Sequence, residues 1–325
     1  MKRMEPAARM DRVRAPAIGS TGRGNTYVLI TPAYNEAAFI GQTIESVTVQ
    51  TRLPLKWIIV DDGSTDQTAD IVHHYAAHLH FMQYCHRVRQ SCDTYYGSNV
   101  YAILQGYAQL KSLDFDYLAI LDADVVLCPD YYEQIFRRFE ANHDLGIATG
   151  TYLEEVDGRM MEAMIDRRST PKALQVFRRA CYEQIGGYIP CPNGGEDTCA
   201  EIMARMNGWQ TWSFPEIRVI HRRPVGQGKG GTLLRSRFRQ GLSDYCVATH
   251  PVFMVAKTLR RCIKEKPLML SGLARLCGFT YGYLTRAPRQ IPRDARRYVR
   301  KEQMRRLLAR LGIGPRLWQP ITPDG

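Results

Sequence analysis

The sequence contains no run of about 20 uninterrupted apolar residues, which is the length that a membrane-spanning helix requires. Residues 267–284 come nearest, and they carry Arg275 at their middle. Residues 1–26 also lack the apolar segment of a signal peptide and are rich in Arg, Ala, Gly and Pro. We therefore expect no simple membrane span, and we expect a flexible basic leader over residues 1–25.

Cysteine pairs at metal-binding or redox spacing are also missing. The nine cysteines are odd in number, scattered along the chain and never spaced as Cys-x-x-Cys. This pattern argues against a disulfide framework and against a zinc site. Reduced thiols in a cytosolic setting are the expected state.

Acidic residues are scarce in the last third of the chain. Residues 218–325 hold 24 Lys and Arg against 5 Asp and Glu, a net charge of +19, whereas residues 1–217 hold 20 against 27, a net charge of −7. A basic region of this kind favours a polyanionic partner, either an anionic membrane or a nucleic acid. Because no nucleic-acid-binding motif or aromatic platform accompanies it, we expect no nucleic acid partner.

Strand and helix patterns alternate over the front of the chain. Short β-rich runs predict strands, the first of which we expect to stop at Pro32, and apolar residues at helical spacing predict helices between them. The predicted strands cover residues 26–31, 55–60, 81–85, 117–127, 146–154 and 217–221, and the predicted helices cover residues 37–50, 67–77, 99–110, 129–140 and 198–206. This alternation predicts an α/β fold with a mostly parallel sheet.

Two carboxylates, Asp122 and Asp124, interrupt the apolar run over residues 117–127. Residues two apart on a strand point to the same side. Two acids where a strand runs out into a loop make an oxygen-rich site for a hard cation, Mg²⁺ or Mn²⁺. The alternative is a turn at the strand end with solvated acids, because Asp-x-Asp alone is a common pattern.

Polar loops follow three of the predicted strands, at residues 31–36, 61–66 and 122–124. In α/β folds, ligands bind beyond the carboxyl ends of the strands. We therefore expect these three loops to converge on one crevice.

Three motifs, in this order and at these separations, carry a family resemblance: Thr31-Pro-Ala-Tyr-Asn-Glu36, Val60-Asp-Asp-Gly-Ser-Thr-Asp66 and Leu121-Asp-Ala-Asp124. Together they resemble the family 2 glycosyltransferases with a GT-A fold, over roughly residues 26–225. The tail resembles the membrane-associated end of some bacterial members. The resemblance implies a nucleotide-sugar donor and a metal-dependent, inverting transfer. The Gln-x-x-Arg-Trp motif of processive synthases is absent, so one sugar per encounter is expected.

The resemblance also implies roles for single residues. It implies that the nucleoside is held by Thr31, Pro32, Tyr34, Glu36, Asp61 and Asp62. Asp124 would bind the metal, and Asp122 would bind the ribose or the metal. Many members carry an Asn in the segment matched by residues 102–106, and Asn99 is the alternative polar contact in this chain.

The predicted strand over residues 217–221 ends in His221-Arg222-Arg223. A lone His is more often a packed or surface residue, but the resemblance implies that His221 contacts the metal or the diphosphate. Arg222 and Arg223 suit phosphate. The glycine-rich residues 226–231 are either a lid over the diphosphate or a solvated linker.

Inversion needs no protein nucleophile, but one carboxylate must take the proton of the acceptor hydroxyl. The loop over residues 192–198 contains Glu196 and Asp197, which match the acidic pair of the family at this place. We expect Asp197 to be the base, with Glu196 as the alternative. The competing interpretation is that Asp197 caps the helix that follows.

Apolar residues recur at helical spacing over residues 295–311, with Arg and Lys between them. A basic amphipathic helix of this kind lies in the plane of an anionic bilayer. The competing interpretation is a helical packing subdomain or a dimer surface. We expect a GT-A domain over residues 26–231 and a basic helical, membrane-associated extension over residues 232–325, peripheral on the cytoplasmic face of the plasma membrane.

The expected activity is transfer of one sugar to a lipid-linked or saccharide acceptor, as in cell-surface polysaccharide or glycolipid synthesis. Three alternatives stay open: a polyprenyl-phosphate sugar synthase, a nucleotidyltransferase and an inactive binding module. The first would use a lipid phosphate as the acceptor, and the second would release pyrophosphate.

Overall fold

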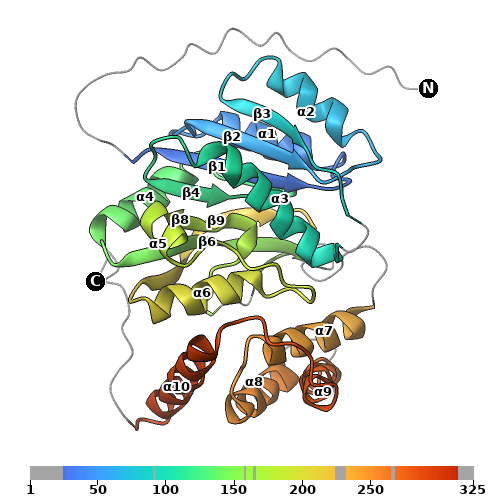
Figure 1. Ribbon diagram of the computed structural model, residues 1–325, viewed down its shortest axis with the longest axis vertical. Coiled ribbons are helices and arrows are strands. Elements are labelled where there is room, and N and C mark those ends of the chain that lie inside the picture. The colour runs from blue at the N-terminus through green and yellow to red at the C-terminus, as the bar shows by residue number, and fades with distance from the viewer. Residues whose placement is uncertain are drawn as a thin grey trace.

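Strands and helices alternate through the first half of the computed structural model, which describes residues 25–90, 93–156, 159–163, 166–223, 232–264 and 268–313. The elements of the sheet domain are β1 (Tyr27–Ala33), α1 (Ile40–Thr48), β2 (Lys56–Asp61), α2 (Thr68–Ala76), β3 (Met82–His86), α3 (Tyr95–Leu110), β4 (Tyr117–Ile120), β5 (Val125–Val126), α4 (Tyr131–Ala141), β6 (Leu145–Val156), β7 (Arg159–Glu162), β8 (Val176–Arg178), α5 (Arg179–Gln184), α6 (Glu196–Met206) and β9 (Gln210–His221). The chain continues with α7 (Leu233–Cys246), α8 (Pro251–Lys264), α9 (Leu270–Leu284) and α10 (Arg293–Arg310). These last helices form a layer of their own next to the sheet domain (Figure 1).

The described strands form one mixed sheet in the order β3-β2-β1-β4-β8-β6-β9-β5, with β7 paired to β6. The strands β1 to β4 are parallel to one another, and β6 is parallel to β9. The short β8 runs antiparallel between β4 and β6, and β5 runs antiparallel to β9. The predicted α/β fold class is confirmed.

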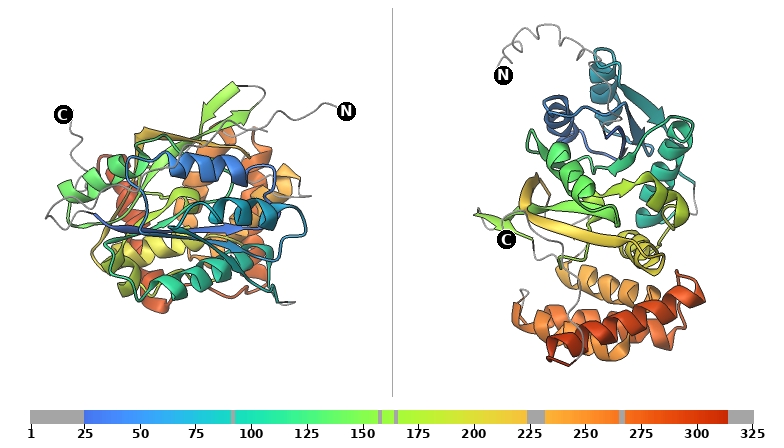
Figure 2. Two further views of the ribbon diagram at one scale, coloured as in Figure 1. Left: turned by 90° about the horizontal axis from the view of Figure 1, so that it is seen from above. Right: turned by 90° about the vertical axis from the view of Figure 1, so that its left-hand side faces the viewer.

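Successive residues of β1 enter two different cores. Tyr27 and Leu29 pack with residues of α1, α2 and α4, whereas Val28 and Ile30 pack with residues of α3, α5 and α6. The alternation follows from strand geometry. Helices cover both faces of the sheet (Figure 2). We therefore expect the polar side chains of the central strands to lie mainly at the strand ends.

The prediction that Pro32 ends the first strand is wrong, because β1 continues to Ala33. The carbonyl of Ile30 accepts a bond from the β4 side, and the carbonyl of Ala33 accepts one from Asp62 on the β2 side. Alternation along β1 therefore turns Pro32 toward the β4 side, where pairing with β4 has already ended at Ile30. The missing N–H of the proline breaks no ladder bond there.

The helices α7 and α9 cross with their backbones in close contact. A Cβ atom at Gly241 would lie 1.8 Å from the carbonyl oxygen of Arg275, and one at Gly278 would lie 1.8 Å from that of Phe238. Glycine permits this approach because it has no Cβ atom. Arg275 is buried here and contacts Asp244, with Nη1 and Oδ2 3.4 Å apart.

Helix α10 packs against α6, and Figure 2 shows it among the helices of the C-terminal layer. Ala295 and Val299 are buried in a cluster that includes Cys199 and Ile202 of α6. The expectation that the apolar side of residues 295–311 faces a bilayer is therefore wrong for this part of the helix, and the alternative of a helical packing subdomain describes it. Within the described residues, no helix is long and apolar enough to span a bilayer. The predicted boundary at residue 231 lies outside the described residues.

Candidate active site

The loop after β1 is bound to the loop after β2 at the carboxyl ends of the two strands. The backbone N–H of Asn35 donates to Ser64 Oγ at 2.9 Å, and that of Thr65 donates to Asn35 Oδ1 at 2.7 Å. The N–H of Glu36 donates to Thr68 Oγ1 at 2.8 Å. Asn35 has a φ of 55°, a left-handed conformation that Asn tolerates well. These bonds hold two of the three polar loops side by side.

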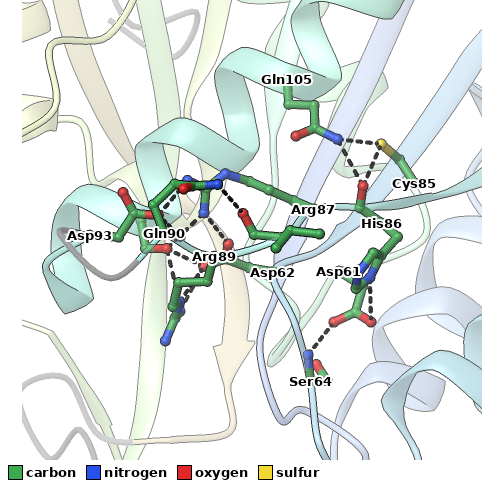
Figure 3. Close-up of polar contacts among 12 residues, drawn as sticks. Asp61, Asp62, Ser64, Cys85, His86, Arg87, Arg89, Gln90, Asp93 and Gln105 are labelled. Carbon is green, nitrogen blue, oxygen red and sulfur yellow. Dashed lines mark hydrogen bonds and ion pairs between the residues drawn. The ribbon is translucent and has the colours of Figure 1, made fainter.

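Asp62 lies buried at the centre of a charged network after β2 (Figure 3). It binds Arg87, it lies 2.6 Å from Nη2 of Arg89, and it accepts a hydrogen bond from Ser98 Oγ at 2.5 Å. Two arginines neutralise a carboxylate that would otherwise be costly to bury. The carboxylate thus already has three protein partners, and its contact with a nucleoside stays a prediction.

Asp61 is held separately from its neighbour. It accepts the Tyr84 hydroxyl at 2.8 Å and the backbone N–H of Ser64 at 2.9 Å. Asp61 is the last residue of β2 and Asp62 follows it, and the two acids of the pair have different partners. The role of Asp61 at the nucleoside also stays a prediction.

Thr31 and Pro32, both expected at the nucleoside, are buried within β1. The hydroxyl of Thr31 accepts a hydrogen bond from the indole of Trp57 at 3.0 Å, and its side chain is wholly buried. The hydroxyl of Thr31 is thus already engaged within the protein, and a contact of Thr31 with the nucleoside stays a prediction.

Tyr34 and Asn99 are placed more favourably for a ligand. The Tyr34 ring lies under the guanidinium of Arg89, 3.9 Å from its centroid to the carbon atom Cζ. Asn99 Oδ1 is buried and has no hydrogen-bond partner within the described part of the chain. A buried acceptor of this kind would be satisfied by a donor group of a ligand or by water.

Asp122 and Asp124 lie in the turn between β4 and β5, because β4 ends at Ile120. The expectation that strand alternation turns them to one side is therefore wrong. Asp122 forms an ion pair with Lys172, with Oδ1 and Nζ 2.5 Å apart. Asp124 instead contacts His221, with Oδ1 and Nε2 3.4 Å apart. The nearest cationic group of each carboxylate thus differs, although the charge of Lys172 also acts on Asp124 and that of Asp122 on His221.

His221 lies at the end of β9, with its ring centroid 5.3 Å from that of Tyr152 and its Nδ1 3.9 Å from Glu154. Burial disfavours the charged imidazole, but the hydrogen bond and charge of Asp124 outweigh it and raise the pKa of His221. Burial would raise the pKa of Asp124, but the contact with His221 and the charge of Arg223 lower it.

Arg223 joins the loop after β1 to the turn after β4. It binds Glu36, and its Nε lies 3.7 Å from Asp124 Oδ2. Burial and the charge of Asp124 raise the pKa of Glu36 to about 7, although Arg223 lowers it. The side chain of Arg222 is exposed. The structure thus brings one of the two arginines expected at the diphosphate into the site.

The site contains side chains of the types that bind a divalent cation, but not a full set of protein ligands for one. The described residues contain no cluster of three or more His, Cys, Asp or Glu that could hold a metal ion. Mg²⁺ is usually bound by one or two carboxylates together with the phosphates of a substrate. Asp124 and His221 are ligands of the types that Mn²⁺ accepts and they lie in contact, so they fit a cation that shares its coordination with a diphosphate. Asp122 fits this role less well because Lys172 already neutralises it.

Glu196 and Asp197 begin helix α6, directly after Gly195, whose φ of 103° is left-handed. Gly195 occupies the N-cap position, and no side chain caps the helix. Asp197 Oδ1 accepts the N–H of the next residue, Thr198, at 2.7 Å. Asp197 is thus not the N-cap residue, but it accepts a backbone N–H of the first turn, and its role as base stays a prediction.

Lys172 connects this acidic pair to Asp122. Besides its ion pair with Asp122, its charge acts on both Glu196 and Asp197. Burial raises the pKa of both acids above their usual range, the charge of Asp197 raises that of Glu196 further, and Lys172 lowers both. Glu196 Oε2 is buried and has no hydrogen-bond partner among the described residues. A carboxylate with a raised pKa is suited to accept a proton near neutral pH.

Sequence reasoning missed Arg87, Arg89 and Lys172. The two arginines follow β3, and this places them at the same edge of the sheet as the other loops. The pattern over residues 82–86 is the signal that could have located them. Lys172 begins a short 3₁₀ turn, Lys172–Leu174, and no motif marks it. The glycine-rich lid expected over residues 226–231 lies outside the described residues.

Comparison with protein families gives a match between residues 28–194 and the family described as Glycosyl transferase family 2. This segment runs from β1 to the residue before Gly195, and it contains the Asp61, Asp62, Asp122 and Asp124 carboxylates.

Two curated relatives match over shorter segments. EpsH of Bacillus subtilis (strain 168), whose name assigns it provisionally to the glycosyltransferases, is 26% identical over 155 residues, which are 48% of this chain and 42% of the relative. The validoxylamine A glucosyltransferase of Streptomyces hygroscopicus subsp. limoneus is 30% identical over 123 residues, 37% of this chain and 25% of the relative. The chain thus spans less than half of the length of these two relatives.

Two solved structures share the fold. TarS residues 1–349 of S. aureus, in complex with UDP-GlcNAc, has a TM-score of 0.52 at 15% identity and covers 84% of this chain and 78% of its own. The mannosyltransferase PcManGT of Pyrobaculum calidifontis, in complex with GDP-Man and Mn²⁺, has a TM-score of 0.52 at 16% identity, covering 88% of this chain and 86% of its own.

Proposed function

This chain belongs to glycosyl transferase family 2, and from that premise we propose that it is a metal-dependent, inverting glycosyltransferase that moves one sugar from a nucleotide-sugar donor to an acceptor hydroxyl. One observation carries the proposal. The Asp124–His221 contact and the Glu196–Asp197 pair are linked through Lys172, which pairs with Asp122 and is influenced by the charges of both Glu196 and Asp197. Structural neighbours with bound UDP-GlcNAc and GDP-Man support the donor class.

The donor would lie over the loops after β1 and β2, with Tyr34 and Asn99 at the nucleoside. Asp124 and His221 would hold the divalent cation, which when bound neutralises charge on the diphosphate leaving group. Arg223 lies next to Asp124 and adds a second positive charge on the same side.

The acceptor would approach the opposite side of the sugar, where α6 begins. Asp197 takes the proton of the acceptor hydroxyl as its oxygen bonds to the anomeric carbon and the bond to the diphosphate breaks with its electron pair. The attack from the far face inverts the configuration. Glu196 is the alternative base, since it is buried and one of its oxygens is without a partner in the described residues.

A lipid-linked acceptor is favoured by an exposed apolar stripe on α8. Val252, Val255, Leu259 and Ile263 recur at helical spacing and are 50–76% exposed. Leu268, Met269 and Leu270, before and at the start of α9, are exposed as well. The stripe belongs to the region of net charge +19, so the occupant that we propose is an anionic bilayer on the cytoplasmic side of the plasma membrane.

Vesicle flotation tests this surface. The full chain is expected to float with phosphatidylglycerol vesicles at low salt and less at high salt, because each basic residue near the surface contributes about 1 kcal/mol. The double variant Leu259→Glu/Ile263→Glu is expected to lose flotation. The matched control Val49→Glu/Val88→Glu changes two residues of the sheet domain that are 60% and 68% exposed, and it should float like the unmodified chain. Equal flotation of both variants, or none by the full chain, would contradict the surface.

Product analysis tests the activity itself. A thermal-shift screen of nucleotide sugars with Mn²⁺ identifies the donor, and the products with candidate acceptors are then separated. Release of a nucleoside diphosphate and a glycosylated hydroxyl is expected. A sugar attached to polyprenyl phosphate would indicate the synthase instead, release of pyrophosphate would indicate a nucleotidyltransferase, and absence of any turnover with every donor would favour a binding module.

A further inference from the structure

A cavity of about 310 Å³ lies at the junction of α6 and α10, and its lining contains none of the residues of the proposed active site. Arg205 comes from the last turn of α6. Glu196 and Asp197 are in the first turn of the same helix, and its 11 residues put about 16 Å between the two ends. The cavity is therefore distinct from the proposed donor site.

The charge of the lining is strongly unbalanced. Four cations face the cavity, Arg168, Arg205, Lys301 and Arg305, but Glu302 is the acid among its lining residues. Lys301 and Arg305 are exposed at the rim, one turn apart on α10. A pocket lined by this excess of basic groups attracts an anion.

The nearby acids do not remove the excess. Asp166 lies outside the cavity and forms ion pairs with Arg306 at 2.8 Å and Arg310 at 3.4 Å. Glu201 lies 3.7 Å from Arg205, also outside the lining, and it accepts hydrogen bonds from Thr170. Burial and the charges of Arg306 and Arg205 together lower the pKa of Arg168. Arg205 in contrast has a raised pKa, because the charges of Glu302 and Glu201 outweigh its burial. Among the lining residues the cations still outnumber the acids.

Glu302 indicates that the ligand of this cavity also carries a hydrogen-bond donor. Its Oε1 lies 2.8 Å from Arg205 Nε and 3.6 Å from Arg168 Nη1, whereas its Oε2 is buried and has no hydrogen-bond partner in the described parts of the chain. A hydroxyl donor would satisfy that oxygen. Trp209 and Tyr298, both partly buried, supply aromatic surface to the same cavity.

We propose that this cavity binds a ligand that combines a phosphate with hydroxyl groups, of the class of a sugar phosphate or a glycerophosphate headgroup. The phosphate lies against Lys301 and Arg305, with the arginines beneath, and a hydroxyl donates to Glu302. Trp209 and Tyr298 pack against the apolar face of the polyol. The volume accommodates a ligand of this size, since small-molecule pockets begin near 300 Å³.

Calorimetric titration with glucose 6-phosphate tests whether the ligand is a soluble sugar phosphate. EDTA is present so that the cation-dependent site does not contribute to the measurement. Glucose 6-phosphate is expected to bind, inorganic phosphate more weakly, and glucose not at all. The variant Lys301→Gln/Arg305→Gln should lose roughly tenfold or more in affinity, because hydrogen bonds to charged groups are lost. The control Arg293→Gln/Arg297→Gln removes the same charge from exposed positions of the same helix outside the cavity, and it should bind like the unmodified chain.

A gain of affinity for inorganic phosphate would show that a variant is folded and that the cations of the cavity are accessible. Glu302→Gln removes the acid that competes for Arg205, so inorganic phosphate, which makes no hydroxyl contact of this kind, is expected to bind more tightly. Glucose 6-phosphate loses the carboxylate to which its hydroxyl donates, so its preference over inorganic phosphate should shrink. Flotation with phosphatidylglycerol vesicles tests the lipid source. A loss of flotation in Lys301→Gln/Arg305→Gln but not in the control supports the site with a headgroup as its ligand. If neither the titration nor the flotation separates these two double variants, the proposal is overturned.

Discussion

Replacement of Asp197 by Asn is expected to reduce sugar transfer by about 10²–10⁴-fold, which is the usual contribution of a general base. The amide keeps the size of the side chain but cannot take a proton from the acceptor hydroxyl. Binding of the donor and of Mn²⁺ should be unchanged, because both depend on the turn after β4 and on the loops after β1 and β2. Transfer rates and donor affinity by calorimetry separate the two effects.

The matched control for Asp197→Asn is Glu196→Gln, at the neighbouring position of the same helix start. The pH dependence of transfer follows from the surroundings of this pair. Lys172 acts electrostatically on both acids, and burial raises the pKa of each. Because a base must be unprotonated, transfer should fall as the pH drops through this raised pKa, at a higher pH than for an ordinary carboxyl group. Near-full transfer by Asp197→Asn together with loss in Glu196→Gln would move the base by one residue, and full transfer by both would leave the loop a structural role.

The loops at the carboxyl ends of the central strands could be predicted because parallel strands bring their ends to one edge. The buried runs of β1, β2 and β4 are short, apolar and bounded by polar residues, so their positions follow from local pattern. The convergence of the loops follows from topology and needs no knowledge of the side chains. The hydrogen bonds between Asn35 and residues 64–65 confirm it for the loops after β1 and β2.

The partners of the carboxylates could not be predicted in the same way. Lys172 and Asp122 are 50 positions apart, and Arg223 and Glu36 are 187 positions apart. Nothing in local spacing records such a contact, because it depends on how β8 and β9 fit into the sheet. For a related reason, local pattern does not distinguish two acids within a strand from two acids in the turn after it. Here β4 ends at Ile120, before Asp122 and Asp124.

Charge and spacing predict that α10 lies on a membrane, whereas the packing of the tail leaves α8 with the exposed apolar stripe. The apolar residues of α10 match a membrane-surface helix in sequence, but Ala295 and Val299 pack against α6. The stripe on α8 was not recognised because its apolar residues lie among Arg and Lys. The hydroxyl of Ser243 in α7 donates to the carbonyl of Gly194 at 2.6 Å, just before the acidic pair. The tail therefore supports the loop that carries Asp197.

Replacement of Asp124 is the second change with a very large expected effect. Asp124→Asn should abolish the Mn²⁺-dependent thermal stabilisation and reduce transfer by at least about 10²-fold, because removal of a single group that stabilises developing charge already costs that much. Asn is preferred to Ala here because His221 and Arg223 both lie against this side chain, and it keeps the buried volume filled.

The control for Asp124→Asn is Asp130→Asn, an exposed acid on the same segment of chain. It should keep both the response to Mn²⁺ and the transfer rate, and the unliganded melting temperatures of the two variants show whether either fold is damaged. Donor affinity without a cation should be the same in both, because the nucleoside contacts lie on other loops. If Asp124→Asn melted normally and still turned over with Mn²⁺ like the unmodified chain, the cation would not be held at this turn, and a site built on Asp122 would have to displace Lys172.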